Sequence, residues 1–225
     1  NGLPAIAEIG LKEFLLGIEW RPGQNLFGIF PMIIGSIYVT AGAVIVGVPT
    51  GILCAVFLAF YCPKGLYALI KPAVGLLAGI PSIVYGFFGL VVIVPAIQNL
   101  TQTSGKGILT ASILLGVMIL PTIIEVTESS LRAVPTVYYE GSLALGATKE
   151  RSIFKSVIVA AKSGVMSAVI LGIGRAIGET MAVIMVAGNQ AAIPKSALSG
   201  VRTLTANIVL EMAYAAELHR EALIA

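Results

Sequence analysis

The sequence predicts an all-α integral membrane protein with at least four membrane-spanning helices. Hydrophobic residues make up 57% of the chain and charged residues only 11%, with a mean hydropathy of +0.98. An ordinary globular domain has about 25% charged residues, so this chain cannot cover a soluble surface. Its uncharged stretches are continuous and far longer than the roughly 9–11 residues of a transmembrane β-strand. Helices are therefore favoured over a barrel.

The uncharged stretches define the spans. A helix needs about 20 mostly apolar residues to cross the hydrocarbon core of a bilayer. Two charged residues, Arg175 and Glu179, interrupt the last stretch, and prolines within the spans are tolerable where neighbouring helices satisfy the freed carbonyls. We predict spans over residues 30–60, 73–97, 108–131 and 164–187.

Basic residues in the loops predict the orientation. Lys64 and Lys71 lie in the 61–72 connection, and five basic residues lie within residues 132–162, whereas the loop near 98–107 has only Lys106. Short loops rich in lysine and arginine stay in the cytoplasm. The chain is thus expected to be one transmembrane domain over residues 1–225, with a cytoplasmic loop at 134–162 and extracytoplasmic segments at 1–26 and 189–225.

The cytoplasmic loop has a helical pattern. Pro135 is well placed to start a helix, Tyr139 and Leu143 recur at helical spacing, and Gly146 can end the helix. A short helix with an exposed apolar face can dock into a groove on a partner protein. The same pattern also suits a helix lying in the lipid interface, and the residues alone do not separate these two interpretations.

The charged pair in the last predicted span is the second notable feature. Arg175 and Glu179 have i,i+4 spacing, which brings opposite charges together on a continuous helix. Each would cost about 2.5–3.5 kcal/mol in the middle of the membrane by insertion scales. The pair could lock two helices together, or it could form a site for an anion, since an arginine can donate two hydrogen bonds to an oxyanion.

The cytoplasmic loop carries a resemblance to a known family. The segment Glu140-Gly-Ser-Leu-Ala-Leu-Gly146-Ala-Thr148 resembles the EAA loop of ABC-importer permeases, with two other small residues in place of the two alanines. The Leu-Pro pair usual after this loop is Ile158-Val159 here. The resemblance implies that residues 136–150 form a coupling helix seated on a cytoplasmic ATPase, with contacts from Tyr139, Glu140, Leu143, Gly146 and Ala147.

Further segments narrow the resemblance. Gly174-Arg-Ala-Ile-Gly-Glu-Thr-Met-Ala-Val183 is similar to the C-type permease of phosphate ABC importers, as are residues 77–86, 119–135 and 202–208. The resemblance extends from about Phe27 to Ala225. It implies the type I ABC-importer permease fold, a bacterial inner-membrane location, and six helices in the intact subunit, one before and one after the four predicted here.

The resemblance also implies a function and partners. The chain would form half of the pathway of an ATP-driven inorganic phosphate importer, with Arg175 meeting the anion and Glu179 as its counter-charge. Its partners would be a second, A-type permease, an ATPase dimer and an extracytoplasmic phosphate-binding protein. ATP and Mg²⁺ would be bound by the ATPase, and this chain would need no cofactor. The net charge of +3 argues against nucleic acid as a partner.

Ser82, Tyr85 and Glu128 are further candidates for the pathway or a gate. Ser82 and Tyr85 follow Pro81 and could line a pathway, and Glu128 could form a gate or an interfacial i,i+4 pair with Arg132. His219 lies in a polar tail, where a solvated position is expected.

The sequence leaves three rival functions open. No nucleophile–base or metal-ligand cluster is evident, which argues against an enzyme. The rivals are an A-type sibling phosphate permease, a type I permease for another oxyanion, and an ion-coupled transporter or channel without an ATPase.

Overall fold

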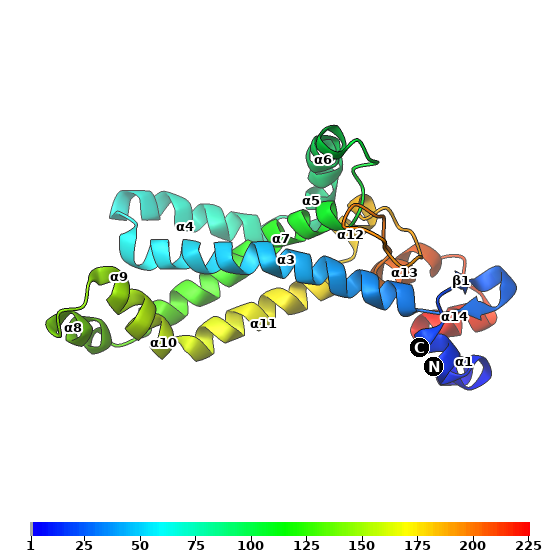
Figure 1. Ribbon diagram of the computed structural model, residues 1–225, viewed down its shortest axis with the longest axis horizontal. Helices are drawn as coiled ribbons and strands as arrows, with labels where there is room; N and C mark the ends of the chain where they lie inside the picture. Colours follow the sequence, from blue (N-terminus) through cyan, green and yellow to red (C-terminus); the bar gives the residue numbers. More distant parts are fainter. Residues whose placement is uncertain (1) are drawn as a thin grey trace. The chain divides into compact units, whose positions relative to one another are not determined.

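The computed structural model describes residues 2–225, and its regular structure is almost entirely helical (Figure 1). The chain forms two compact units. Unit 1 comprises the residues up to Ala43, Pro81–Leu115 and Ile177–Ala225, and unit 2 comprises Val44–Ile80 and Gly116–Ala176. The single domain expected over residues 1–225 stays a prediction. The unit boundaries fall at Ile80–Pro81 and within three helices, α3 (Phe30–Val56), α7 (Ile108–Arg132) and α11 (Lys162–Gly178).

Within residues 2–225, three helical segments are long and apolar enough to cross a membrane. They are Phe30–Tyr61, in which α3 continues into the π-helix η2 (Phe57–Tyr61), then Ser82–Thr101, and α7. A fourth is formed by the pair Lys149–Ala160 and Lys162–Gly178 if this pair, bent by 74°, is one span. The first and third predicted spans are confirmed.

The second predicted span, 73–97, has the wrong bounds, because the candidate span here is Ser82–Thr101. Helix α4 (Lys64–Gly79) ends at Gly79, and a new helix begins after Pro81, so the prediction joined parts of two helices. Proline has no N–H to donate and disfavours a helical conformation of the preceding residue. Ile80 accordingly has an extended backbone. The second segment consists of α5 (Ser82–Phe88), the π-helix η3 (Gly89–Ile93) and α6 (Val94–Thr101).

The predicted span 164–187 is also interrupted. Helix α11 ends at Gly178, and α12 (Met181–Val186) begins after Thr180. Between the two helices, Oε1 of Glu179 accepts hydrogen bonds from the backbone N–H groups of Thr180 and Ala182, at 3.1 and 3.2 Å. The side chain thereby satisfies N–H groups that a helix start leaves without partners.

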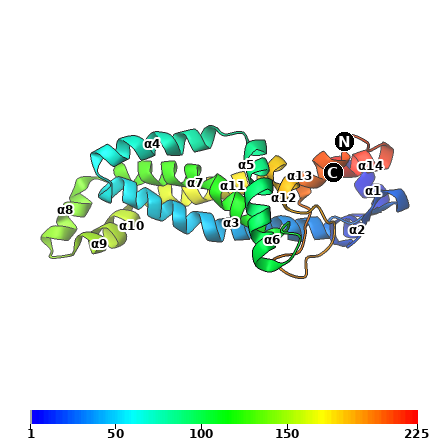
Figure 2. The same cartoon turned by 90° about the horizontal axis from the view of Figure 1, so that it is seen from above.

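Small residues let the helices of unit 2 pack closely. A Cβ at Gly51 of α3 would lie 2.7 Å from Ile123 of α7, and one at Gly164 of α11 would overlap Ser130 of α7. Close approach at small residues is typical of helices packed in lipid. Figure 2 shows α4 lying along α3 and α7. Val74 of α4 packs with Leu58 of η2 and Ile124 of α7.

The remaining elements of unit 2 follow α7. They are α8 (Thr136–Ala144), α9 (Lys149–Ser152), the π-helix η4 (Ile153–Val157) and α10 (Ile158–Ala160). Their buried side chains Ile153 and Val157 pack with Leu131 and Val56. This core holds the loop after α7 against the ends of α3 and α7.

Unit 1 brings the two ends of the chain together. Its first residues form α1 (Leu3–Ile9), α2 (Leu11–Leu16) and an antiparallel hairpin of β1 (Trp20–Arg21) and β2 (Leu26–Phe27), closed by the 3-10 turn η1 (Pro22–Gln24). The last residues form α13 (Leu204–Glu211) and α14 (Glu217–Ile224). Trp20, Phe27 and Leu223 pack in one apolar core.

Candidate functional site

Helix α8 carries an exposed apolar surface. It begins after Pro135, as the sequence predicts, and its last residue, Ala144, is followed by a turn at Gly146. The φ of Gly146, +85°, lies in the left-handed region that favours glycine. The N–H of Ala147 then bonds the carbonyl of Ser142, which closes the helix end. Val137 is 73% exposed and Leu145 is 91% exposed. Helix α8 lies at one end of unit 2 (Figure 1), where these apolar side chains are exposed.

The predicted contact residues of α8 divide into two groups. Glu140, Leu143 and Gly146 are exposed, so they are available to a partner. Tyr139, in contrast, is half-buried, stacks on Phe60 of η2 with ring centroids 6.1 Å apart, and packs against the core around Ile153.

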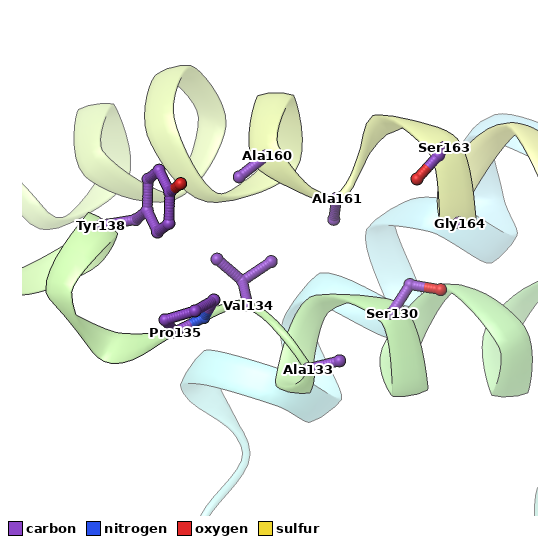
Figure 3. Close-up of a pocket in the computed structure, with 9 residues that line it drawn as sticks. All are labelled: Ser130, Ala133, Val134, Pro135, Tyr138, Ala160, Ala161, Ser163 and Gly164. Atoms are coloured by element: carbon purple, nitrogen blue, oxygen red, sulfur yellow. The ribbon is translucent and has the colours of Figure 1, made fainter.

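Tyr138 of α8 lines one end of a groove. The groove has a volume of about 460 Å³ and lies between the end of α7 and the start of α11. Figure 3 shows Tyr138 and Val134 on one side, facing Ala160 and Ala161 on the other. Ser130 lies at the far end, where its hydroxyl already donates to the carbonyl of Val126.

Arg175 lies in unit 2 near the end of α11. Its side chain is half-buried, and Nη1 donates a hydrogen bond to Oγ1 of Thr122 on α7, at 3.2 Å. Within the described part of unit 2, no carboxylate lies within ion-pair distance of this guanidinium. The arginine is therefore oriented by a neutral hydroxyl, which leaves most of its donors free for another acceptor.

Glu179, Ser82 and Tyr85 lie in unit 1. Because α11 ends at Gly178, the i,i+4 geometry expected on a continuous helix does not apply to Arg175 and Glu179. The Glu179 carboxylate instead caps α12. Ser82 begins α5, and Tyr85 is buried on that helix, which packs against α12. The proposed pathway roles of these residues stay predictions.

Glu128 is the centre of a charge cluster in unit 2. The side chain is 2% exposed, and its carboxylate accepts hydrogen bonds from Lys71 Nζ at 2.9 Å, Arg132 Nε at 2.8 Å and the Tyr67 hydroxyl at 2.8 Å. Arg132 also donates to the carbonyl of Leu58. The i,i+4 pair of Glu128 and Arg132 is confirmed, and the cluster around it joins η2, α4 and α7.

Tyr67 belongs to α4, outside the three continuous candidate spans. The hydrogen bond from its hydroxyl to the Glu128 carboxylate raises the pKa of Tyr67, because the negative acceptor favours the protonated phenol. The Arg132 guanidinium stacks over the tyrosine ring, 4.9 Å from its centroid. The tyrosine stays neutral at physiological pH and holds α4 to α7 as a donor.

Residues 47–216, more than half of the chain, match the family described as binding-protein-dependent transport system inner membrane component. The chain belongs to this family of permeases.

Several curated relatives of this chain are described as transport permeases. The permease is 40% identical over 205 residues to the probable ABC transporter permease protein YqgH of Bacillus subtilis, with 90% of this chain and 66% of that protein covered. It is 36% identical over 242 residues to the phosphate transport system permease protein PstC of Mesorhizobium japonicum, with 98% and 74% covered. The similarity to PstC proteins that the sequence motifs indicate is thus confirmed. The chain spans about two thirds of the length of YqgH.

A solved structure supports the fold of the permease. A chain of the MetNI methionine ABC transporter, in inward facing conformations, matches with a TM-score of 0.60 at 22% identity, covering 88% of this chain and 85% of that one. The type I ABC-importer permease fold is therefore confirmed. With its apolar helices, the permease is a multi-pass protein of the inner membrane, as predicted.

Sequence reasoning missed a polar cluster in unit 1 of the permease. Glu211 accepts hydrogen bonds from Arg202 at 2.6 Å, from Trp20 Nε1 at 2.7 Å and from His219 Nε2 at 2.9 Å. The expected solvated position of His219 is wrong, because its side chain is only 14% exposed. The i,i+8 separation of Glu211 and His219 spans a turn between two helices, which helical periodicity does not reveal.

Proposed function

We propose that this chain is a transmembrane subunit of an ATP-driven importer of inorganic phosphate, in which it forms half of the translocation pathway. The observation that carries the proposal is Arg175, a half-buried arginine in the membrane region with most of its donors free. An arginine in that environment attracts an anion and can donate two parallel hydrogen bonds to a phosphate oxyanion. The similarity to PstC proteins over most of the chain supports phosphate as that anion.

We propose that α8 couples the pathway to an ATPase dimer. Its exposed apolar side chains, chiefly Val137 and Leu145, are of the kind that a short helix inserts into a groove of a partner protein. ATP and Mg²⁺ would bind to the ATPase, and this chain would bind no cofactor. A second, A-type permease would supply the other half of the pathway, and an extracytoplasmic phosphate-binding protein would deliver the anion.

The role of Arg175 can be tested by uptake of radiolabelled phosphate in cells that express the complete transporter. Arg175→Ala should reduce uptake by about a hundredfold or more, since a direct charge-assisted contact with the anion is worth about 3 kcal/mol. Arg175→Lys should retain part of the activity because it keeps the charge but loses the fork. The amount of assembled complex in the membrane is measured for each variant.

Three results would reject parts of the proposal. Unchanged phosphate uptake by an assembled Arg175→Ala complex would show that the arginine does not meet the anion. Uptake of sulfate that competes with phosphate at equal concentration would instead favour a permease for another oxyanion. An absence of any ATPase in the purified complex would favour an ion-coupled transporter or channel.

A further inference from the structure

Glu125 is a carboxylate in the membrane segment α7 that has no assigned role. It is half-buried, and no hydrogen bond or ion pair joins it to another described residue of unit 2. The Glu125 carboxylate lies close to α4, since a Cβ added to Gly75 of that helix would lie 3.7 Å from Glu125 Oε1. A charged side chain within a membrane segment is costly, and it usually faces a protein partner or a water-filled path.

The residue lies beside the hydroxyl that orients Arg175. Thr122 and Glu125 are three positions apart on α7, so their side chains lie on neighbouring parts of one helix face, with Cβ atoms about 5–6 Å apart. Both are half-buried. Because Arg175 Nη1 donates to Thr122 Oγ1, the guanidinium already reaches the helical turn next to Glu125.

The helix directions bring the two charges closer. Gly164 of α11 packs on Ser130 of α7, and Gly172 packs on Ile123, so the two helices run antiparallel. Side chains on a helix lean toward its own N-terminus. The Arg175 side chain therefore leans along α7 in the direction of Glu125, and the Glu125 side chain leans in the direction of Thr122.

We propose that Glu125 is a counter-charge of Arg175 inside unit 2, which attracts the guanidinium electrostatically without forming an ion pair in this structure and repels the anion once it has arrived. The inference rests on the proposed role of Arg175 in phosphate passage. Glu125 is a positioning residue in this scheme because it acts through the arginine. Its negative charge keeps anion binding weak, so that the anion leaves for the cytoplasm instead of staying on the arginine.

The first test compares Glu125→Gln with the unaltered permease in the complete transporter. Removing the negative charge should tighten binding of radiolabelled inorganic phosphate to the purified complex, measured without the binding protein, on the order of tenfold. It should also slow the maximal uptake rate, because release becomes harder. Glu125→Asp keeps the charge and should resemble the unaltered permease in both measurements. Glu19→Gln, at an exposed carboxylate of unit 1, is the matched control.

The outcomes separate this inference from the proposed function. If Arg175→Ala abolishes uptake while Glu125→Gln binds and transports phosphate normally, Glu125 is not a counter-charge and only this inference fails. If Arg175→Ala leaves uptake unchanged, the pathway role of the arginine fails as well. Tighter binding together with slower uptake supports both.

A second measurement covers the case in which Glu125→Gln does not assemble. In a variant with Glu125→Cys and Arg175→Cys, in which Cys54 and Cys62 are replaced by serine, the two introduced thiols should be joined by a short thiol-reactive cross-linker in isolated membranes. A cysteine at Ile124, which is buried toward Leu58 and Val74, should give much less cross-linking to position 175. Equal yields from positions 124 and 125 would overturn the proposed proximity.

Discussion

The carboxylate of Glu128 is 2% exposed and lies 2.9 Å from the ammonium of Lys71. The second cation, Arg132, contacts the other carboxylate oxygen at 2.8 Å. The burial is unequal, since the Lys71 side chain is 34% exposed and the Arg132 side chain is 48% exposed. The cluster is therefore a buried anion covered by two cations that still reach their surroundings.

Because the anion is buried and the cations are partly exposed, removing the cations should cost more stability than removing the anion. Replacing both Lys71 and Arg132 by methionine leaves the carboxylate buried without a cation, which should destabilise unit 2 by about 3–5 kcal/mol. Glu128→Gln leaves cations that can turn to water or lipid headgroups, so its cost should be smaller, about 1–2 kcal/mol. Thermal unfolding of the purified permease in detergent measures both. Equal destabilisation by the two changes would contradict the inequality.

Gly146 should be needed for coupling more than for folding. Its φ of +85° is unfavourable for a residue with a Cβ, by roughly 1–2 kcal/mol, so Gly146→Ala should shift the end of α8 and lower ATPase activity stimulated by phosphate. Gly141→Ala on the same helix is the control, because a Cβ there meets nothing within 4 Å. We expect normal coupling in the control. The same loss in both variants would argue against a role for the left-handed turn.

Leu145 and Tyr139 should respond to substitution in opposite ways. Leu145 is 91% exposed, and Leu145→Ser should weaken ATPase binding tenfold or more, since burying a leucine contributes about 1.5–3 kcal/mol, without changing the stability of the permease alone. Tyr139 stacks on Phe60, so Tyr139→Ser should lower that stability. Co-purification of the ATPase and thermal unfolding give the two readouts. Normal ATPase binding by Leu145→Ser would reject α8 as the docking helix.

The sequence predicted the features that depend on local chemistry. Uncharged length is sufficient to locate the spans that begin near Phe30 and Ile108, and Pro135 and Gly146 mark the limits of α8. The break at Pro81 was missed because proline is tolerated within other helices here, as at Pro49 and Pro121. Only the packing around a proline decides between a kink and a helix end.

The contacts between distant segments could not be predicted from one sequence. Lys71 and Glu128 are 57 positions apart, and Trp20 and Glu211 are 191 positions apart. Periodicity reports which face of a helix is apolar, but it does not report which other helix covers that face. Arg175 was recognised because its charge stands out in an apolar stretch, whereas its partner Thr122 is an ordinary residue of a membrane helix.

Glu211 should hold the two ends of unit 1 together. Its side chain is 9% exposed and accepts hydrogen bonds from Trp20, Arg202 and His219, so Glu211→Ala leaves three donors without their acceptor and should cost about 3–5 kcal/mol. Trp20 is the single tryptophan of the sequence, so its fluorescence reports on this site and should shift to longer wavelength as the indole meets water. Glu19→Gln, close in sequence but half-exposed, should leave the emission unchanged. An unshifted spectrum for Glu211→Ala would mean that the apolar contacts with Phe27 and Leu223 alone keep the indole buried.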